Sequence, residues 1–62
     1  MFKVELNYYW GDGEFHSGVC YLTVTSYNQI TYLVQEHKPK HASVAYCMVY
    51  VNGEYYCTQE VV

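Results

Sequence analysis

The first ten residues alternate between apolar and polar side chains. Apolar residues fall at every second position from Phe2 to Trp10, and the positions between them hold charged residues, asparagine or tyrosine. A period of two places the two sets on opposite faces of an extended chain. We therefore predict a half-buried β-strand over residues 2–10.

Turn-forming residues follow this strand. Asp12 and Gly13 suit a two-residue type I′ turn, which requires positive φ at both positions. A second strand from residue 15 or 16 to 25 would then return antiparallel and place Phe15 opposite Trp10. Gly18 marks a bulge or a weak point within it.

A helix is predicted after the second strand. Ser26 and Gln29 have the spacing of a capping box, in which each side chain bonds the backbone N–H of the other residue. Pro39 ends the pattern, which spans about three turns. The positions that share one helical face are Tyr27, Ile30, Leu33, Val34 and His37.

The last third of the chain reads as a hairpin. Residues 43–51 are almost continuously apolar, Asn52-Gly53 is a strong signal for a type I′ turn, and residues 54–61 return. We predict a single α+β domain over residues 1–62, of order ββαββ, with a four-stranded, mainly antiparallel sheet and one helix packed on one face. Strands two and three run in the same direction, either adjacent or separated by strand one.

Neither face of the third predicted strand is polar. Val44, Tyr46, Met48 and Tyr50 point one way, and Ala45, Cys47, Val49 and Val51 point the other. A two-residue turn would place Tyr50 opposite Tyr55, Met48 opposite Cys57, Tyr46 opposite Gln59, Val49 opposite Tyr56 and Cys47 opposite Thr58. Because one short helix covers only one face, we assign the smaller residues to the helix and the tyrosines to the outside.

Composition narrows the class of partner. Nine of the 62 residues are tyrosine, none is arginine, and the net charge is −3. Binding of nucleic acids depends on neutralising phosphates with Lys and Arg, so we exclude nucleic acid and anionic membrane surfaces. Tyrosine has a large apolar ring with a polar tip, which suits protein interfaces.

Reactive side chains form no recognisable motif. Cys20, Cys47 and Cys57 are an odd number without a CxxC pair or a secretory leader, so we predict free thiols in the reducing cytoplasm. The lysines between His37 and His41 disfavour a metal there. We predict no catalytic, metal or cofactor site.

These observations predict a non-enzymatic protein-binding module, a homodimer formed face to face or edge to edge. Small acidic chains are common among inhibitors and regulators encoded by phages and other mobile elements, so we expect inhibition or regulation of a larger protein. The predicted partner-binding residues are Tyr46, Met48, Tyr50, Tyr55 and Glu54, with Glu60 at the rim. Two alternatives stay open: a solvated sheet face covered by tyrosines, and a small-molecule or metal site in a dimer cleft.

Overall fold

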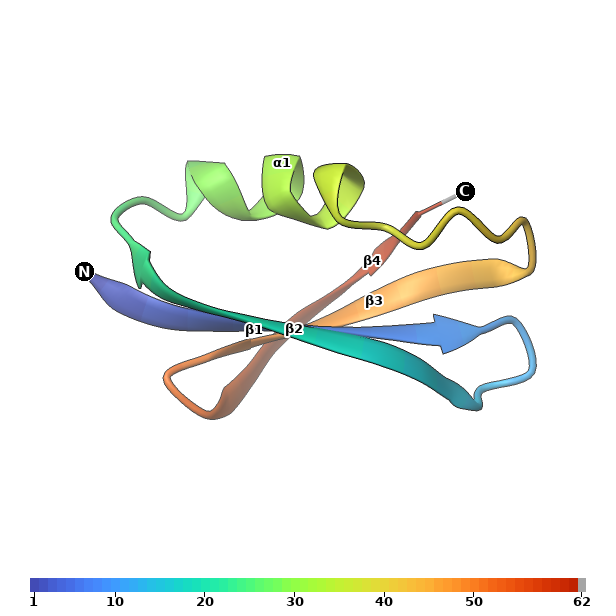
Figure 1. Cartoon of the computed structure of the whole chain (residues 1–62). Helices are drawn as coiled ribbons and strands as arrows, with labels where there is room; N and C mark the ends of the chain where they lie inside the picture. Colours follow the sequence, from blue (N-terminus) through green and yellow to red (C-terminus); the bar gives the residue numbers. More distant parts are fainter. Residues whose placement is uncertain (62) are drawn as a thin grey trace.

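The computed structural model describes residues 1–61, apart from the side chain of Leu22. The α+β class, with one helix packed on an antiparallel sheet, is confirmed (Figure 1). The elements in chain order are β1 (Phe2–Trp10), β2 (Phe15–Val24), α1 (Asn28–Glu36), β3 (Val44–Val51) and β4 (Glu54–Glu60).

The strands form one sheet of order β2-β1-β3-β4, and each neighbouring pair is antiparallel. Strand β1 therefore separates β2 from β3, which settles the choice that the sequence left open. The helix crosses one side of this sheet (Figure 1). We call that side the inner face and the opposite side the outer face.

The core lies between α1 and the inner face. The apolar phase of β1 supplies three fully buried side chains, and β3 supplies small residues that were assigned to the helix side. That assignment is confirmed for Cys47 and Val49 but is wrong for Ala45 and Val44. Ala45 is the extra residue of a bulge and lines a hollow with Tyr46 and Met48, whereas Val44 is buried in the core. The core residues that are at most 1% exposed are Val4, Leu6, Tyr8, Ile30, Val34, Cys47 and Val49.

The predicted capping box forms only in part. The Gln29 side-chain oxygen accepts from the backbone N–H groups of Ser26 at 3.2 Å and Thr25 at 3.0 Å. The Ser26 hydroxyl accepts from the N–H of Asn28 instead of Gln29, at 3.2 Å. The Gln29 N–H bonds the Ser26 carbonyl oxygen at 3.1 Å, so the helix begins at Asn28, after a turn that Gln29 closes.

The connection between β1 and β2 differs from the predicted type I′ turn. Gly13 has a φ of 97°, whereas Asp12 is not among the residues with positive φ. The N–H of Gly13 bonds the Trp10 carbonyl oxygen at 2.9 Å, and the Trp10 N–H bonds the Glu14 carbonyl oxygen at 2.8 Å. This is a longer loop in which a single glycine adopts the left-handed conformation.

The longer loop changes the register that follows it. Phe15 lies opposite Tyr9 and not opposite Trp10, and His16 is an extra residue in β2. The predicted Trp10–Phe15 pair is therefore wrong. Gly18 is paired directly with Asn7, and a side chain there would lie 2.8 Å from the Asn7 Oδ1 atom. Glycine thus allows close approach at this position, and the bulge lies elsewhere.

The turn at Asn52-Gly53 is confirmed, with φ values of 51° and 84°. The Asn52 side-chain oxygen accepts from the Lys3 N–H at 3.0 Å, which ties this turn to β1.

The strands that leave this turn keep the predicted register for one pair only. Tyr50 lies opposite Tyr55, but Tyr56 is then an extra residue in β4. The bulge shifts every later pair by one position, so the other four predicted pairs are wrong. The observed pairs beyond the bulge are Val49–Cys57, Met48–Thr58, Cys47–Gln59 and Tyr46–Glu60.

Candidate functional site

The outer face carries the second set of side chains from each strand. Cross-strand partners share a face of the sheet, so the register assigns them. The members are Lys3, Glu5, Asn7 and Tyr9 from β1, Phe15, Gly18 and Cys20 from β2, Tyr46, Met48 and Tyr50 from β3, and Tyr55, Thr58 and Glu60 from β4.

A three-ring cluster lies at the end of this face nearest the β1–β2 turn. The rings of Tyr9 and Tyr46 are stacked, with centroids 5.2 Å apart and planes 10° apart. Phe15 meets Tyr9 edge to face at 5.7 Å, and its side chain is 57% exposed. Each ring limits the rotation of its neighbour, so the cluster is ordered before any partner binds.

A second cluster lies toward the β3–β4 turn. Tyr50 and Tyr55 meet edge to face at 5.9 Å. The Tyr55 hydroxyl shares a 2.7 Å hydrogen bond with the Thr58 hydroxyl, while 56% of the Tyr55 side chain stays exposed. This bond fixes the direction of an aromatic ring that solvent reaches.

Between the clusters, the surface is hollowed. A hollow of about 440 Å³ is lined by Ala45, Tyr46, Met48, Thr58 and Glu60. The bulge at Tyr56 places Thr58 opposite Met48 and turns Cys57 to the inner face, opposite Val49. The hollow therefore has an apolar floor from β3 and a polar rim from β4.

The structure groups four of the five predicted binding residues. Tyr46, Met48 and Tyr50 are half-buried side by side on β3, and Tyr55 is paired with Tyr50. Glu54 is exposed but lies opposite Val51, whose partner on β1 is the buried Val4. Glu54 therefore belongs to the inner side of the sheet, and Glu60 is the acidic residue beside Tyr46.

Sequence reasoning missed Tyr9 and Phe15 as members of this surface. Tyr9 follows Lys3, Glu5 and Asn7 in the set of alternate β1 positions that otherwise holds polar residues. An aromatic ring in that set points away from the core, which was the available signal. Phe15 could not be placed because the longer β1–β2 loop changed its partner.

The three cysteines have three different environments: Cys20 is exposed, Cys57 is half-buried and Cys47 is buried, and all three are free thiols. Burial is the main cause that raises the pKa of the Cys47 thiol to about 12; a backbone hydrogen bond at Asn7 lowers it in part, and the nearby Cys57 adds a smaller increase. A thiol that stays protonated at neutral pH is a poor nucleophile, so Cys47 acts as a small core residue.

The histidines of the basic loop do not converge. The ring centroids of His37 and Tyr21 are 4.9 Å apart, whereas those of His41 and Trp10 are 4.6 Å apart. Trp10 also contacts His16 at 4.7 Å. Among residues 1–61, no group of three or more Cys, His, Asp or Glu side chains could hold a metal ion.

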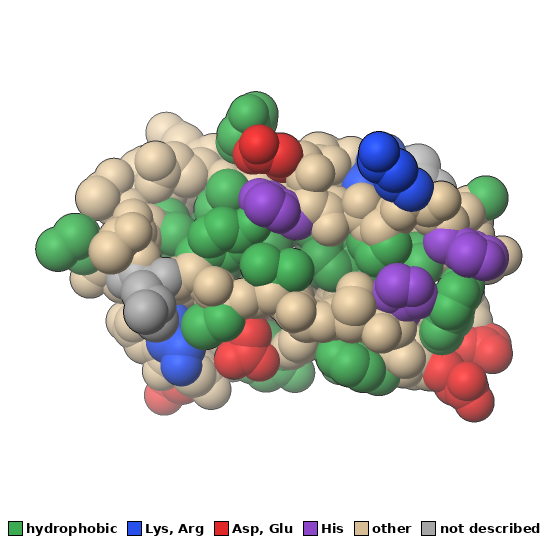
Figure 2. All heavy atoms as spheres, in the orientation of Figure 1, with side chains coloured by type: hydrophobic (Ala, Val, Ile, Leu, Met, Phe, Trp, Pro, Cys, Tyr) green, Lys and Arg blue, Asp and Glu red, His purple; other side chains and the backbone are tan. Residues whose placement is uncertain are grey.

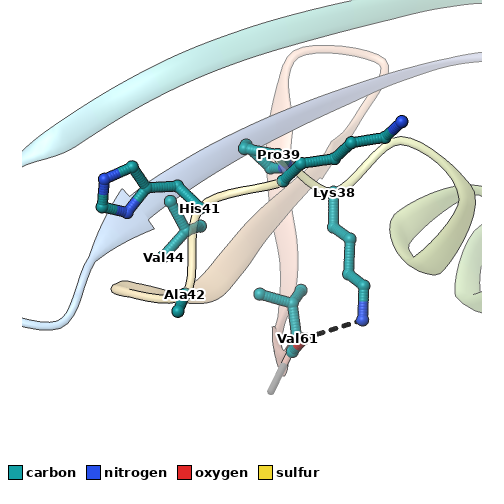
Figure 3. Close-up of a pocket in the computed structure, with 7 residues that line it drawn as sticks. Lys38, Pro39, His41, Ala42, Val44 and Val61 are labelled. Carbon is teal, nitrogen blue, oxygen red and sulfur yellow. Dashed lines mark hydrogen bonds between the residues drawn. The ribbon is translucent and has the colours of Figure 1, made fainter.

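A second hollow of about 310 Å³ lies under this loop, lined by Lys38, Pro39, Lys40, His41, Ala42, Val44 and Val61. Figure 3 shows the Lys38 ammonium group reaching the Val61 carbonyl oxygen, at 3.4 Å. That bond ties the loop to the end of β4, so Lys38 has a structural role here.

No family model matches the chain, and comparisons with curated proteins and with solved structures also found no match. Within the described residues, no helix has both the length and the apolar character needed to cross a membrane.

Proposed function

We propose that this chain is a non-enzymatic protein-binding module, a dimeric inhibitor or regulator that binds a larger protein through the outer sheet face. One observation carries the proposal: aromatic side chains on the face opposite α1 are held in place by one another and remain exposed to solvent. Phe15 and Tyr55 are each more than half exposed although both take part in ring contacts.

The arrangement suits binding because ordered rings lose little conformational freedom when a partner covers them. Tyrosine is enriched among the residues that dominate interface energies, and the hollow beside Tyr46 offers a pocket for a partner side chain. The outer face carries Glu5 in its centre and Glu60 on the edge strand, against one lysine, Lys3, and the whole chain has a net charge of −3. A basic partner surface complements that charge.

Adjacent tyrosines in β4 provide a matched test. Tyr55 lies on the outer face, and Tyr56 stacks on Tyr27 at the start of α1, on the inner side. Their exposed fractions are similar, 56% and 49%. A tagged chain is used to capture a partner, and the affinity of the purified partner is then measured for wild type, Tyr55→Ala and Tyr56→Ala. We expect Tyr55→Ala to weaken binding about 30-fold, which corresponds to about 2 kcal/mol, and Tyr56→Ala to leave it nearly unchanged.

Equal losses in the two variants would contradict the proposal, because a general loss of folding would then explain both. Circular dichroism on each variant checks that the fold is retained. If the chain retains no protein, and a metabolite or metal ion raises its melting temperature in a Tyr46-dependent way, the small-molecule alternative replaces the proposal.

A further inference from the structure

The sheet has two edge strands, β2 and β4, because the strand order is β2-β1-β3-β4. An edge strand presents backbone N–H and C=O groups that can pair with another chain, and proteins usually protect such edges with charges, prolines or covering side chains. The ten residues of β2, Phe15–Val24, include no charged residue and no proline. This edge lacks the charges and prolines that discourage pairing. Bulges at His16 and between Tyr21 and Val24 leave Ser17–Tyr21 as the regular stretch that can pair.

The opposite edge is protected. Strand β4 begins with Glu54, ends with Glu60 and contains the bulge at Tyr56. The Gln35 side chain of α1 donates to the Glu60 carbonyl oxygen at 3.4 Å, and Lys38 donates to the Val61 carbonyl oxygen at the same distance. Self-pairing of β4 would also bring glutamates of two copies together.

The hydrogen bonds of β1 show which backbone groups of β2 are open. Trp10 bonds Glu14 on the β2 side, whereas the Lys3 carbonyl oxygen accepts from Asn52 on the β3 side. Alternate residues of a strand face opposite sides, so the even positions of β1 face β2. Their partners Ser17, Val19 and Tyr21 then turn toward β1. Gly18 and Cys20, which lie between those partners, turn their N–H and C=O groups to the open edge.

Apolar surface flanks this edge. A groove of about 210 Å³ runs between β2 and α1, lined by Tyr21, Thr23, Val24, Gln29, Tyr32 and Leu33. Figure 2 shows hydrophobic side chains in a band across this part of the molecule. The Tyr21 hydroxyl is buried with no hydrogen-bond partner among the described residues.

We infer that β2 pairs antiparallel with β2 of a second copy and joins the two sheets edge to edge. A second copy fits because two uncharged strands meet without repulsion, and a two-fold axis closes the assembly. Pairing of β2 with β4 of another copy would instead leave open edges and meet glutamates. Because antiparallel partners keep the same face, both outer faces lie on one side of the joined sheet, and the aromatic surface is doubled.

This inference specifies the dimer within the proposed function. Its test is the mass of the full chain in solution, measured by sedimentation across a concentration series. Cys20→Pro removes an N–H from the open edge, where proline is tolerated, and leaves the pairing with β1 intact. Cys20→Ala is the matched control, because it removes the same thiol and keeps the N–H. We expect Cys20→Pro to weaken dimerisation about 30-fold, since the symmetric dimer loses one bond from each copy, and Cys20→Ala to dimerise like wild type.

Amide hydrogen exchange on wild type gives a second measurement that does not depend on the folding of a variant. In the dimer, the amides of Gly18 and Cys20 should exchange as slowly as those of Ser17 and Val19; in a monomer they would exchange much faster. A monomeric wild type, or unprotected Gly18 and Cys20 amides in a dimer, would overturn the edge pairing. Partner binding that still depends on Tyr55 would then leave the proposed function standing. A β2-paired dimer whose partner binding is unaffected by Tyr55→Ala would support the edge pairing and contradict the proposed function.

Discussion

Tyr8 and Tyr9 are neighbours in β1, yet they lie in different physical environments. Tyr8 is fully buried on the inner face, and its hydroxyl donates to the Val34 carbonyl oxygen at 2.7 Å. Tyr9 is half-buried on the outer face, between the rings of Tyr46 and Phe15. The same side chain therefore stabilises the fold at one position and forms part of an accessible surface at the next.

The contrast extends to the whole sheet. On the inner face, the helix removes apolar side chains from water, and the Tyr8 hydroxyl satisfies one of the last helix carbonyls, which have no partner within the helix. Burial raises the pKa of the Tyr8 hydroxyl well above its usual range, with smaller contributions from Cys47 and Tyr21. On the outer face, the rings contact one another and solvent. We therefore expect the inner face to control stability and the outer face to tolerate substitution without unfolding.

The largest expected difference comes from removing apolar volume on each face. Leu6→Ala leaves a cavity beneath α1 and should lower the free energy of unfolding by about 3 kcal/mol. Met48→Ala on the outer face should cost about 1 kcal/mol or less, because Met48 is half-exposed. Urea unfolding of both variants measures the two losses. Equal losses would show that the outer face is part of the stabilising core.

Alkaline pH should destabilise the fold through two buried groups of the inner face, the Cys47 thiol and the Tyr8 hydroxyl. The folded chain keeps a proton on Cys47 up to a pKa of about 12, whereas the unfolded chain releases it near pH 9. The unfolded state therefore binds fewer protons above that pH, and the free energy of unfolding falls as the pH rises, by about 1.4 kcal/mol per unit for one group. The raised pKa of Tyr8 adds to the loss at higher pH.

Urea unfolding from about pH 8 to about pH 11 measures the slope of the free energy of unfolding against pH. In Cys47→Ala the part of the slope that begins near pH 9 should disappear, although the variant is less stable throughout. A wild-type stability that does not change over this range would contradict the burial of both groups.

The smallest of these effects compares two hydroxyl deletions. Tyr8→Phe leaves the buried Val34 carbonyl oxygen without its partner and should cost about 1–2 kcal/mol. Tyr9→Phe is the matched control in the adjacent position, and it should change stability by less than about 0.5 kcal/mol. Thermal and urea unfolding of the pair provide the comparison, and a cost for Tyr9→Phe as large as that for Tyr8→Phe would contradict the assignment of the two faces.

Local patterns in the sequence predicted the fold class and most of its elements. The alternation of β1 identified Val4, Leu6 and Tyr8 as one face, and Asn52-Gly53 identified its turn, because both signals depend on residues close together in the chain. The same reasoning placed Cys47 on the helix side. These features follow from backbone geometry and side-chain size, which a short stretch of sequence contains.

The positions of the single-residue bulges were not predicted, and the one bulge suggested at Gly18 lies elsewhere. His16, Ala45 and Tyr56 are each an extra residue within a strand pair. A bulge becomes favourable only when the partner strand and the faces on both sides are in place, so no local pattern indicates it. Its effect is large, because a shift of one residue moves each later side chain to a different partner and face.

The sequence by itself determined that the chain alternates, turns and crosses over as ββαββ, with more apolar strand surface than one helix can cover. Tertiary structure alone decided which residues the bulges and the longer loop moved: Phe15, Thr58 and Glu60 joined the outer face, and Glu54 and Cys57 did not. The physical reason is that strand register depends on contacts between residues far apart in the chain, whereas turns and periodicity depend on neighbours.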